Sequence, residues 1–331
     1  MPPTATRPPA RRRGSVRSRT AAALSFHTLR RLGTVLPPEQ AWGLWASRRI
    51  VATVMDAFGP PLTGVRVQPV EVTTAAGRRV RGEWVLAPGI ERADRAIYFL
   101  HGSGYAMCSP RTHRRLTAWL SRLTRLPVFC LDYRLAPRHP FPAAADDAHA
   151  GWDWLRDEVG LAEERIVLAG DSAGGHLAVD LLLHSPAHPR PAAMVLFSPL
   201  ADLTLHRARQ RELLRPDPAI RSVDAARLVG LYCRGVHPDH PRLSHDIAAG
   251  PPFPPTLVQA GGAEMLAADA EHLATTIRLA GGDCTLQIWP DQVHVFQALP
   301  RLSPEAAQAM TVAARFISEA IPAGDRTGIA V

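Results

Sequence analysis

The hydrophobic positions of this chain change their spacing along its length. Apolar residues from about 22 to 58 recur at helical spacing, and Pro37 and Pro38 interrupt them, which predicts two amphipathic helices. Over 65–72 and 79–86, apolar and polar residues alternate with a period of two, as is typical of half-buried antiparallel strands. The pattern therefore predicts a helical N-terminal region that is followed by a sheet.

Short continuous apolar runs then alternate with longer helical patterns. Such runs are typical of strands that are buried on both faces of a parallel sheet. Regular alternation with helices predicts right-handed crossovers between parallel strands. The fold class is therefore α/β, with a central, mostly parallel sheet flanked by helices. The apolar runs lie at 96–100, 128–131, 166–169, 194–197, 256–258 and 285–288, and the helical patterns at 111–124, 143–157, 173–184, 266–280 and 304–319.

Three segments lie outside this alternation. Residues 1–20 hold six arginines, four prolines and no acid, and we expect a disordered tail there. The stretch from about 200 to 250 is rich in Arg, His, Asp and Pro, which predicts an insertion over one end of the sheet. We expect it to form a helical cap together with the segment at about 22–58. The predicted organisation is one domain over 21–331 that carries both cap elements.

Six of the eight net positive charges of the chain come from the N-terminal tail. Without its six arginines, the rest of the chain holds 32 basic residues against 30 acidic ones, so the domain offers no basic surface for nucleic acid. Contact of the tail with nucleic acid or an anionic membrane stays an alternative. No apolar stretch reaches the roughly 18 residues of a membrane span, and no signal peptide is evident. The four scattered cysteines, with no C-x-x-C pair, favour a reducing, cytoplasmic location.

A candidate nucleophile lies where a predicted strand meets a predicted helix. The sequence Gly170–Gly174 (GDSAG) fits the G-x-S-x-G pattern, in which a sharp turn projects the serine hydroxyl from the sheet edge. A serine hydroxyl needs such exposure and a nearby base before it can attack a substrate. The helix that follows Ser172 also offers the backbone N–H of Ala173 and its positive dipole end to developing negative charge.

A second glycine-rich turn lies upstream, where the apolar run at 96–100 leads into His101–Tyr105 (HGSGY). Small residues there allow backbone N–H groups to face the oxygen of a tetrahedral intermediate. We expect the N–H groups of Gly102 and Ser103 to act in this way, and the side chains of Tyr105 and Met107 to line an acyl pocket.

Taken together, these motifs resemble the hormone-sensitive-lipase-like family of α/β-hydrolases, a group that holds many bacterial carboxylesterases. The resemblance spans residues 96–300. Ser103 departs from the family pattern, because it replaces the middle glycine of the HGGG loop. The matching segments are His101–Gly104, Asp132–Pro137 (DYRLAP) with Phe141–Ala144 (FPAA), Gly170–Gly175 (GDSAGG), Pro254–Leu257 with Gly261–Asp269, and His294–Phe296.

The resemblance implies a catalytic triad in the chain order Ser, acid, His. It assigns His294 as the base and puts Glu264 where the family usually carries aspartate, with Asp269 as the alternative acid. Glutamate is an accepted triad acid, because its carboxylate can also accept the histidine Nδ1–H. The resemblance further implies supporting roles for His101, which would order the oxyanion loop, and for Gly104 and Asp171.

The predicted function is that of a serine carboxylesterase which hydrolyses short- to medium-chain acyl esters through an acyl-enzyme intermediate, without a cofactor or a metal. A deacetylase or lactone hydrolase of a specialised metabolite would use the same triad and stays an alternative. A non-catalytic small-molecule receptor is less favoured, because all three triad residues are present. The expected partner is a small-molecule ester, with no nucleic acid and no stable membrane insertion. The sequence leaves the oligomeric state open, including a homo-oligomer.

Overall fold

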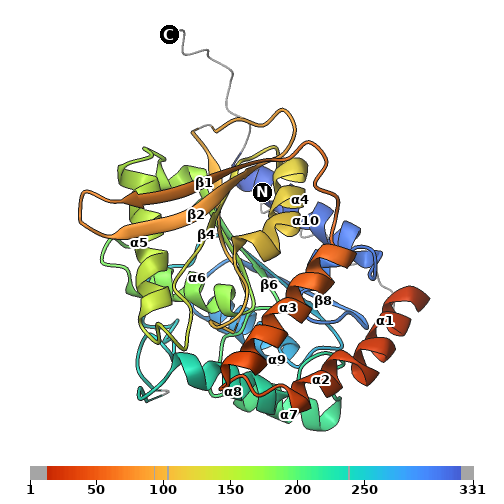
Figure 1. The fold of residues 1–331 in the computed structure, drawn as a ribbon. Helices are drawn as coiled ribbons and strands as arrows, with labels where there is room; N and C mark the ends of the chain where they lie inside the picture. The colour runs from red at the N-terminus through yellow and green to blue at the C-terminus, as the bar shows by residue number, and fades with distance from the viewer. Residues whose placement is uncertain (1–12, 93, 103, 238, 322–331) are drawn as a thin grey trace.

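The computed structural model describes residues 13–92, 94–102, 104–237 and 239–321 (Figure 1). Its strands form one sheet in the order β1-β2-β4-β3-β5-β6-β7-β8. The β1–β2 and β2–β4 pairs are antiparallel and all the others are parallel, so the predicted α/β fold with a mostly parallel sheet is confirmed. The strands are β1 (Arg66–Thr73), β2 (Arg79–Leu86), β3 (Ala96–Leu100), β4 (Val128–Leu131), β5 (Ile166–Asp171), β6 (Ala193–Phe197), β7 (Thr256–Gly261) and β8 (Cys284–Trp289).

Helices cover both faces of the sheet. Successive strand residues point to opposite faces, so Tyr98 and Leu100 belong to one core while Ile97 and Phe99 belong to the other. This explains why the buried strands consist of continuous apolar residues. The first core includes residues of α5 (Ala143–Asp157), α6 (Ala173–His184) and α9 (Ala267–Leu279), and the second includes residues of α4 (Pro110–Thr124) and α10 (Glu305–Ala320).

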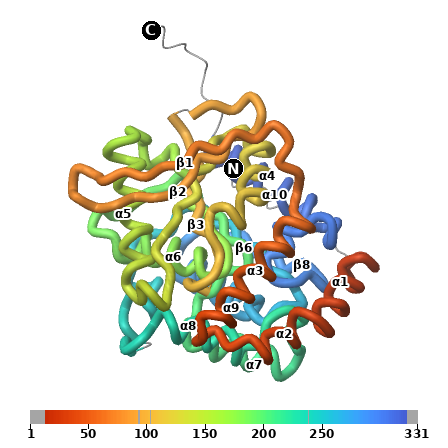
Figure 2. The backbone as a smooth tube through the Cα atoms, in the orientation of Figure 1, coloured from red at the N-terminus to blue at the C-terminus, as the bar shows by residue number. Residues whose placement is uncertain are grey.

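The two predicted cap segments lie against one another. Figures 1 and 2 show α2 (Leu29–Val35) and the start of α3 (Ala41–Phe58) beside α7 (His206–Leu214) and α8 (Ser222–Tyr232), although these elements are far apart in the sequence. Arg30 Nη1 lies 2.8 Å from Glu212 Oε1, and Arg227 donates two hydrogen bonds to Glu39. Among the described residues, no helix is both long and apolar enough to cross a bilayer. The cap helices are α1 (Val16–His27), α2 (Leu29–Val35), α3 (Ala41–Phe58), α7 (His206–Leu214) and α8 (Ser222–Tyr232).

The N-terminal segment differs from the prediction in two ways. It holds three helices rather than two, because the chain also leaves helical geometry at Thr28. The expected disorder over 1–20 is wrong for its last residues, since α1 begins at Val16. Ser15 caps this helix, and the Ser15 N–H and Ser18 Oγ each donate to the Glu305 carboxylate at 2.6 Å, which anchors α1 to α10. Residues 1–12 lie outside the described part of the chain.

The start of α6 approaches the sheet so closely that it requires glycine. A Cβ atom at Gly174 would lie 1.9 Å from the carbonyl oxygen of Leu100 on β3. A Cβ atom at Gly170 would lie 2.7 Å from the carbonyl oxygen of Gly174. Both obstacles are backbone atoms, so a side chain at either position would push the helix away from the sheet.

We expect the substitution Gly174→Ala to lower the free energy of unfolding by about 2 kcal/mol or more, since the added methyl group meets backbone that cannot move aside. Gly230→Ala is the matched control, because nothing lies within 4 Å of a Cβ atom in that helical position. There the substitution should be neutral or stabilise by up to about 1 kcal/mol. Urea denaturation of both variants measures the difference, and equal stabilities would contradict the role given to Gly174.

Candidate active site

A cavity of about 200 Å³ lies between the carboxyl edge of the sheet and the cap. Ser172 and His294 both line it, and so does Met107, as the sequence predicts. Most of the remaining wall is apolar, so the cavity suits a hydrocarbon group better than a charged one. The apolar side chains include Val51 and Met55 of α3, Leu228 and Val229 of α8, and Leu200, Leu205, Met265 and Leu266 from the loops after β6 and β7.

Ser172 occupies a tight turn between β5 and α6. Its φ of 51° and ψ of −120° lie in a region that residues with side chains rarely adopt. Three hydrogen bonds hold this conformation: the Ser172 N–H donates to the carbonyl of Phe197, and its own carbonyl accepts from the N–H groups of Gly175 and Leu200. The turn therefore presents the side chain to the cavity while the backbone stays tied to β6 and the loop that follows it.

Glu264 and His294 form a buried pair beside this serine. The Nδ1–H of His294 donates to Glu264 Oε2 at 2.5 Å. The other carboxylate oxygen, Oε1, accepts from the Ser198 hydroxyl at 2.7 Å and from the Gly261 N–H at 2.5 Å. These bonds compensate a carboxylate that is only 1% exposed. Burial alone would lower the pKa of His294, but the charge and hydrogen bond of Glu264 outweigh it, so that pKa is raised from its ordinary value of 6.5.

Ser198 connects the acid to the histidine loop. Besides donating to Glu264, its hydroxyl oxygen accepts the N–H of Val295, the residue after His294, at 3.0 Å. This residue was not among the predicted site residues. Its place directly after the apolar run at 194–197 puts it at the carboxyl edge of the sheet, and that placement is the signal that could have identified it.

The alternative acid, Asp269, lies elsewhere. Its Oδ2 accepts the N–H groups of Ala201 and Asp202 at 2.9 and 3.0 Å, which holds the loop after β6. Burial raises the pKa of Asp269 to about 7, against a partial opposing effect of these two hydrogen bonds. The carboxylate that the structure brings to His294 is therefore that of Glu264.

The oxyanion loop differs from the prediction at Gly102. Its N–H donates to Asp171 Oδ1 at 2.8 Å, and Oδ2 of the same carboxylate pairs with Nε2 of His113 at 3.2 Å. The Gly102 N–H is thus engaged and cannot serve a substrate oxygen. Gly104 lines the cavity with a φ of 53°, and Ala173 occupies the first turn of α6, where N–H groups lack intrahelical partners. Ser103 lies outside the described residues.

Two predicted site residues are buried beside the cavity. His101 stacks on Tyr133 with ring centroids 4.2 Å apart, and burial lowers its pKa to about 3, so its ring is neutral. This position fits a role in ordering the loop. Tyr105 does not line the cavity as expected, because its fully buried ring stacks on that of Tyr232, with centroids 3.9 Å apart.

Comparisons with known proteins identify the family and the fold of this chain. Residues 97–298 match the sequence profile of a family described as having the alpha/beta hydrolase fold. The esterase LipU of Mycobacterium tuberculosis is 35% identical over 79% of this chain and 89% of its own length. An acetyl-hydrolase of Streptomyces hygroscopicus is 35% identical over 81% of this chain and 88% of its own. The crystal structure of an esterase from the bacterial hormone-sensitive lipase family is also similar, with a TM-score of 0.81 and 32% identity over 93% of this chain and 99% of that one.

The contact between Glu264 and His294 predicts how the histidine titrates. The pKa of His294, followed by nuclear magnetic resonance of its ring, should lie above 6.5 in the wild type. Glu264→Gln should lower it, because the substitution removes the negative charge that stabilises the imidazolium. Asp269→Asn should leave it unchanged. A titration in which Asp269→Asn, rather than Glu264→Gln, lowers this pKa would reverse the choice of acid.

Proposed function

The chain belongs to the α/β-hydrolase family, in its hormone-sensitive-lipase-like group of carboxylic ester hydrolases, and we propose that it cleaves short- to medium-chain acyl esters through a serine acyl-enzyme. One observation carries this proposal: Ser172 and His294 line one apolar cavity, and the Glu264 carboxylate accepts a hydrogen bond from Nδ1 of the histidine. A nucleophile, a base and an orienting acid in this arrangement form the constellation that acyl transfer requires.

In acylation, His294 removes the proton of the Ser172 hydroxyl as Oγ attacks the ester carbonyl. The carbonyl oxygen gains negative charge, which the Ala173 N–H and the positive end of α6 stabilise, together with the loop at Gly104. A donor of this kind typically contributes about 2.7–4 kcal/mol. The imidazolium then gives its proton to the departing alkoxide, which leaves as an alcohol. A contribution of the Ser103 N–H stays a prediction from the sequence.

In deacylation, His294 takes a proton from a water molecule that attacks the acyl-enzyme, and returns it to Ser172 Oγ as the acid leaves. Glu264 keeps the ring oriented in both halves of the cycle and stabilises the imidazolium. Since only the neutral ring accepts a proton, the rate should rise as the pH increases through the raised pKa of His294.

The size and the lining of the cavity support the proposed short- to medium-chain acyl group. Its volume of about 200 Å³ and its apolar wall suit a short or medium hydrocarbon chain. One related esterase structure, 32% identical with a TM-score of 0.80 over 94% of this chain and all of that chain, comes from a crystal that was soaked with p-nitrophenyl butyrate. The acetyl-hydrolase relative favours a second candidate, removal of an acetyl group from a larger metabolite by the same residues.

Ser172→Ala should lower kcat/KM for p-nitrophenyl butyrate by a factor of about 10³ or more, because no other group can form the acyl-enzyme. Ser47→Ala is the matched control, since that hydroxyl only donates to the carbonyl of Gly43 within α3. Its activity should equal that of the wild type. If Ser172→Ala kept activity within tenfold of the wild type, the proposed nucleophile would be wrong.

The apolar wall predicts a chain-length preference that Leu228 controls. A Cβ atom at Gly104 would lie 3.3 Å from Leu228 Cβ, so this leucine lies directly against the oxyanion loop. Leu228→Trp should fill the cavity and lower kcat/KM for p-nitrophenyl octanoate by about tenfold or more, while activity on the acetate changes much less. Leu279→Trp, at a position that is 84% exposed, should leave the C2 to C12 profile unchanged. Equal losses on both esters in Leu228→Trp would show that the acyl chain lies elsewhere.

A further inference from the structure

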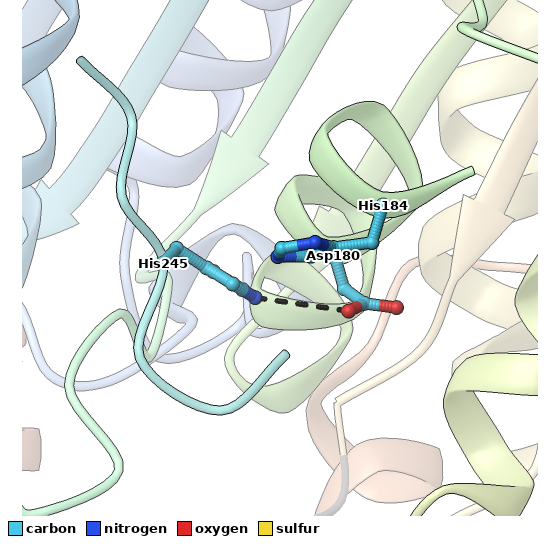
Figure 3. A group of neighbouring side chains, drawn as sticks. All are labelled: Asp180, His184 and His245. Atoms are coloured by element: carbon cyan, nitrogen blue, oxygen red, sulfur yellow. Dashed lines mark ion pairs between the residues drawn. The ribbon is translucent and has the colours of Figure 1, made fainter. Parts of the chain in front are cut away.

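A second cluster of polar side chains lies on α6, further along the helix that begins after Ser172. Asp180 and His184 are four residues apart, so both point from one face of this helix. His245, from the chain segment after α8, approaches the same face (Figure 3). One ligand-type atom of each residue lies within 4.8 Å of the other two. A helical pair at this spacing with a third group from a distant segment is a common way to build a metal site.

The hydrogen bonds of Asp180 leave one lone pair of its Oδ1 atom available to a ligand. Its Oδ2 accepts from His149 Nε2 at 3.0 Å and from Arg242 Nη2 at 2.9 Å, which uses both lone pairs of that oxygen. Its Oδ1 accepts from Arg242 Nε at 3.1 Å, and His245 Nε2 lies 4.0 Å from the same oxygen. This gap is too long for a hydrogen bond but short enough for one small ion between the two atoms.

The two histidines present unused ring nitrogens. The side chain of His245 is only 4% exposed, and the Nε2 atoms of both His184 and His245 are buried without a hydrogen-bond partner. A neutral imidazole carries one N–H and one lone pair, so each ring offers the lone pair of Nε2 when its proton is on Nδ1.

We propose that Asp180 Oδ1, His184 Nε2 and His245 Nε2 bind a divalent transition metal of the Zn²⁺ class, at a site separate from the catalytic cavity. Two imidazoles and one carboxylate oxygen are the ligand types that Zn²⁺ prefers, and a water molecule would complete four-coordination. Ligand atoms about 2.1 Å from a tetrahedral ion lie about 3.4 Å apart. The present separations, 4.0 Å between Asp180 Oδ1 and His245 Nε2 and up to 4.8 Å within the cluster, therefore have to shorten on binding. Arg242 shares the carboxylate, so we expect weaker binding than at a four-ligand structural site.

The metal would connect the cap to the catalytic domain. His245 belongs to the chain segment between α8 and β7, whereas Asp180 and His184 belong to α6. An ion held between them ties this part of the cap to the helix that carries Ser172 at its start. Binding to the folded state alone stabilises it by mass action. The prediction of no metal rests on cysteine spacing, which carries no signal for these three residues.

The test uses the full-length protein after treatment with a chelator and dialysis. Isothermal titration with Zn²⁺ should show one site with a dissociation constant below about 100 μM, and Zn²⁺ should raise the Tm. Co²⁺ should give the visible absorption bands of a tetrahedral ion with nitrogen and oxygen ligands. His184→Gln and His245→Gln should each weaken Zn²⁺ binding by about tenfold or more and abolish the shift in Tm.

His237→Gln is the control, because that side chain is 78% exposed and lies outside the cluster. It should bind Zn²⁺ as the wild type does. Far-ultraviolet circular dichroism confirms that each variant is folded before the titration. The proposal is overturned if the wild type does not bind Zn²⁺ below that limit, or if binding is unchanged in both His184→Gln and His245→Gln, because the ion would then lie at other residues.

Discussion

The strained backbone at Ser172 is the constraint on which the rest of the site depends. A residue at a φ of 51° between a buried strand and a helix turns the chain so sharply that the first turn of α6 meets the carbonyl of Leu100. Only glycine at 170 and 174 allows that contact. In return, the turn exposes a hydroxyl group and directs the helix N-terminus to the same place, so that nucleophile and charge stabilisation come from one local conformation.

The buried carboxylate of Glu264 connects the remaining parts. It accepts hydrogen bonds from Ser198 after β6, from Gly261 at the end of β7 and from His294 after β8. A buried charge without these donors would cost several kcal/mol, and with them it joins three loops that are distant in sequence. Parallel strands end at one edge of the sheet, which is why three consecutive loops can meet at one carboxylate.

The parts of the structure that depend on the local pattern of apolar residues and glycines could be predicted from the sequence. Continuous apolar runs identified the buried strands, because both faces of the sheet are covered, and the glycine spacing identified the turn at Ser172. Predictions failed where the direction of one group depends on distant contacts: the Gly102 N–H points to Asp171, and the ring of Tyr105 packs on Tyr232. Hydrophobic periodicity carries no information about such directions, and Ser198 has no motif of its own.

The environment of His294, the base that the family resemblance assigns, differs from those of other buried histidines among the 14 in the chain. Burial lowers the pKa of His101 to about 3 and that of His176 to about 4, so these rings stay neutral inside the fold. His294 experiences the same penalty, but its direct contact with the Glu264 carboxylate reverses the direction of its pKa shift. A ring that can hold a proton while it lines the cavity with Ser172 is what a general base needs, and this combination arises from the pairing with Glu264 rather than from the histidine itself.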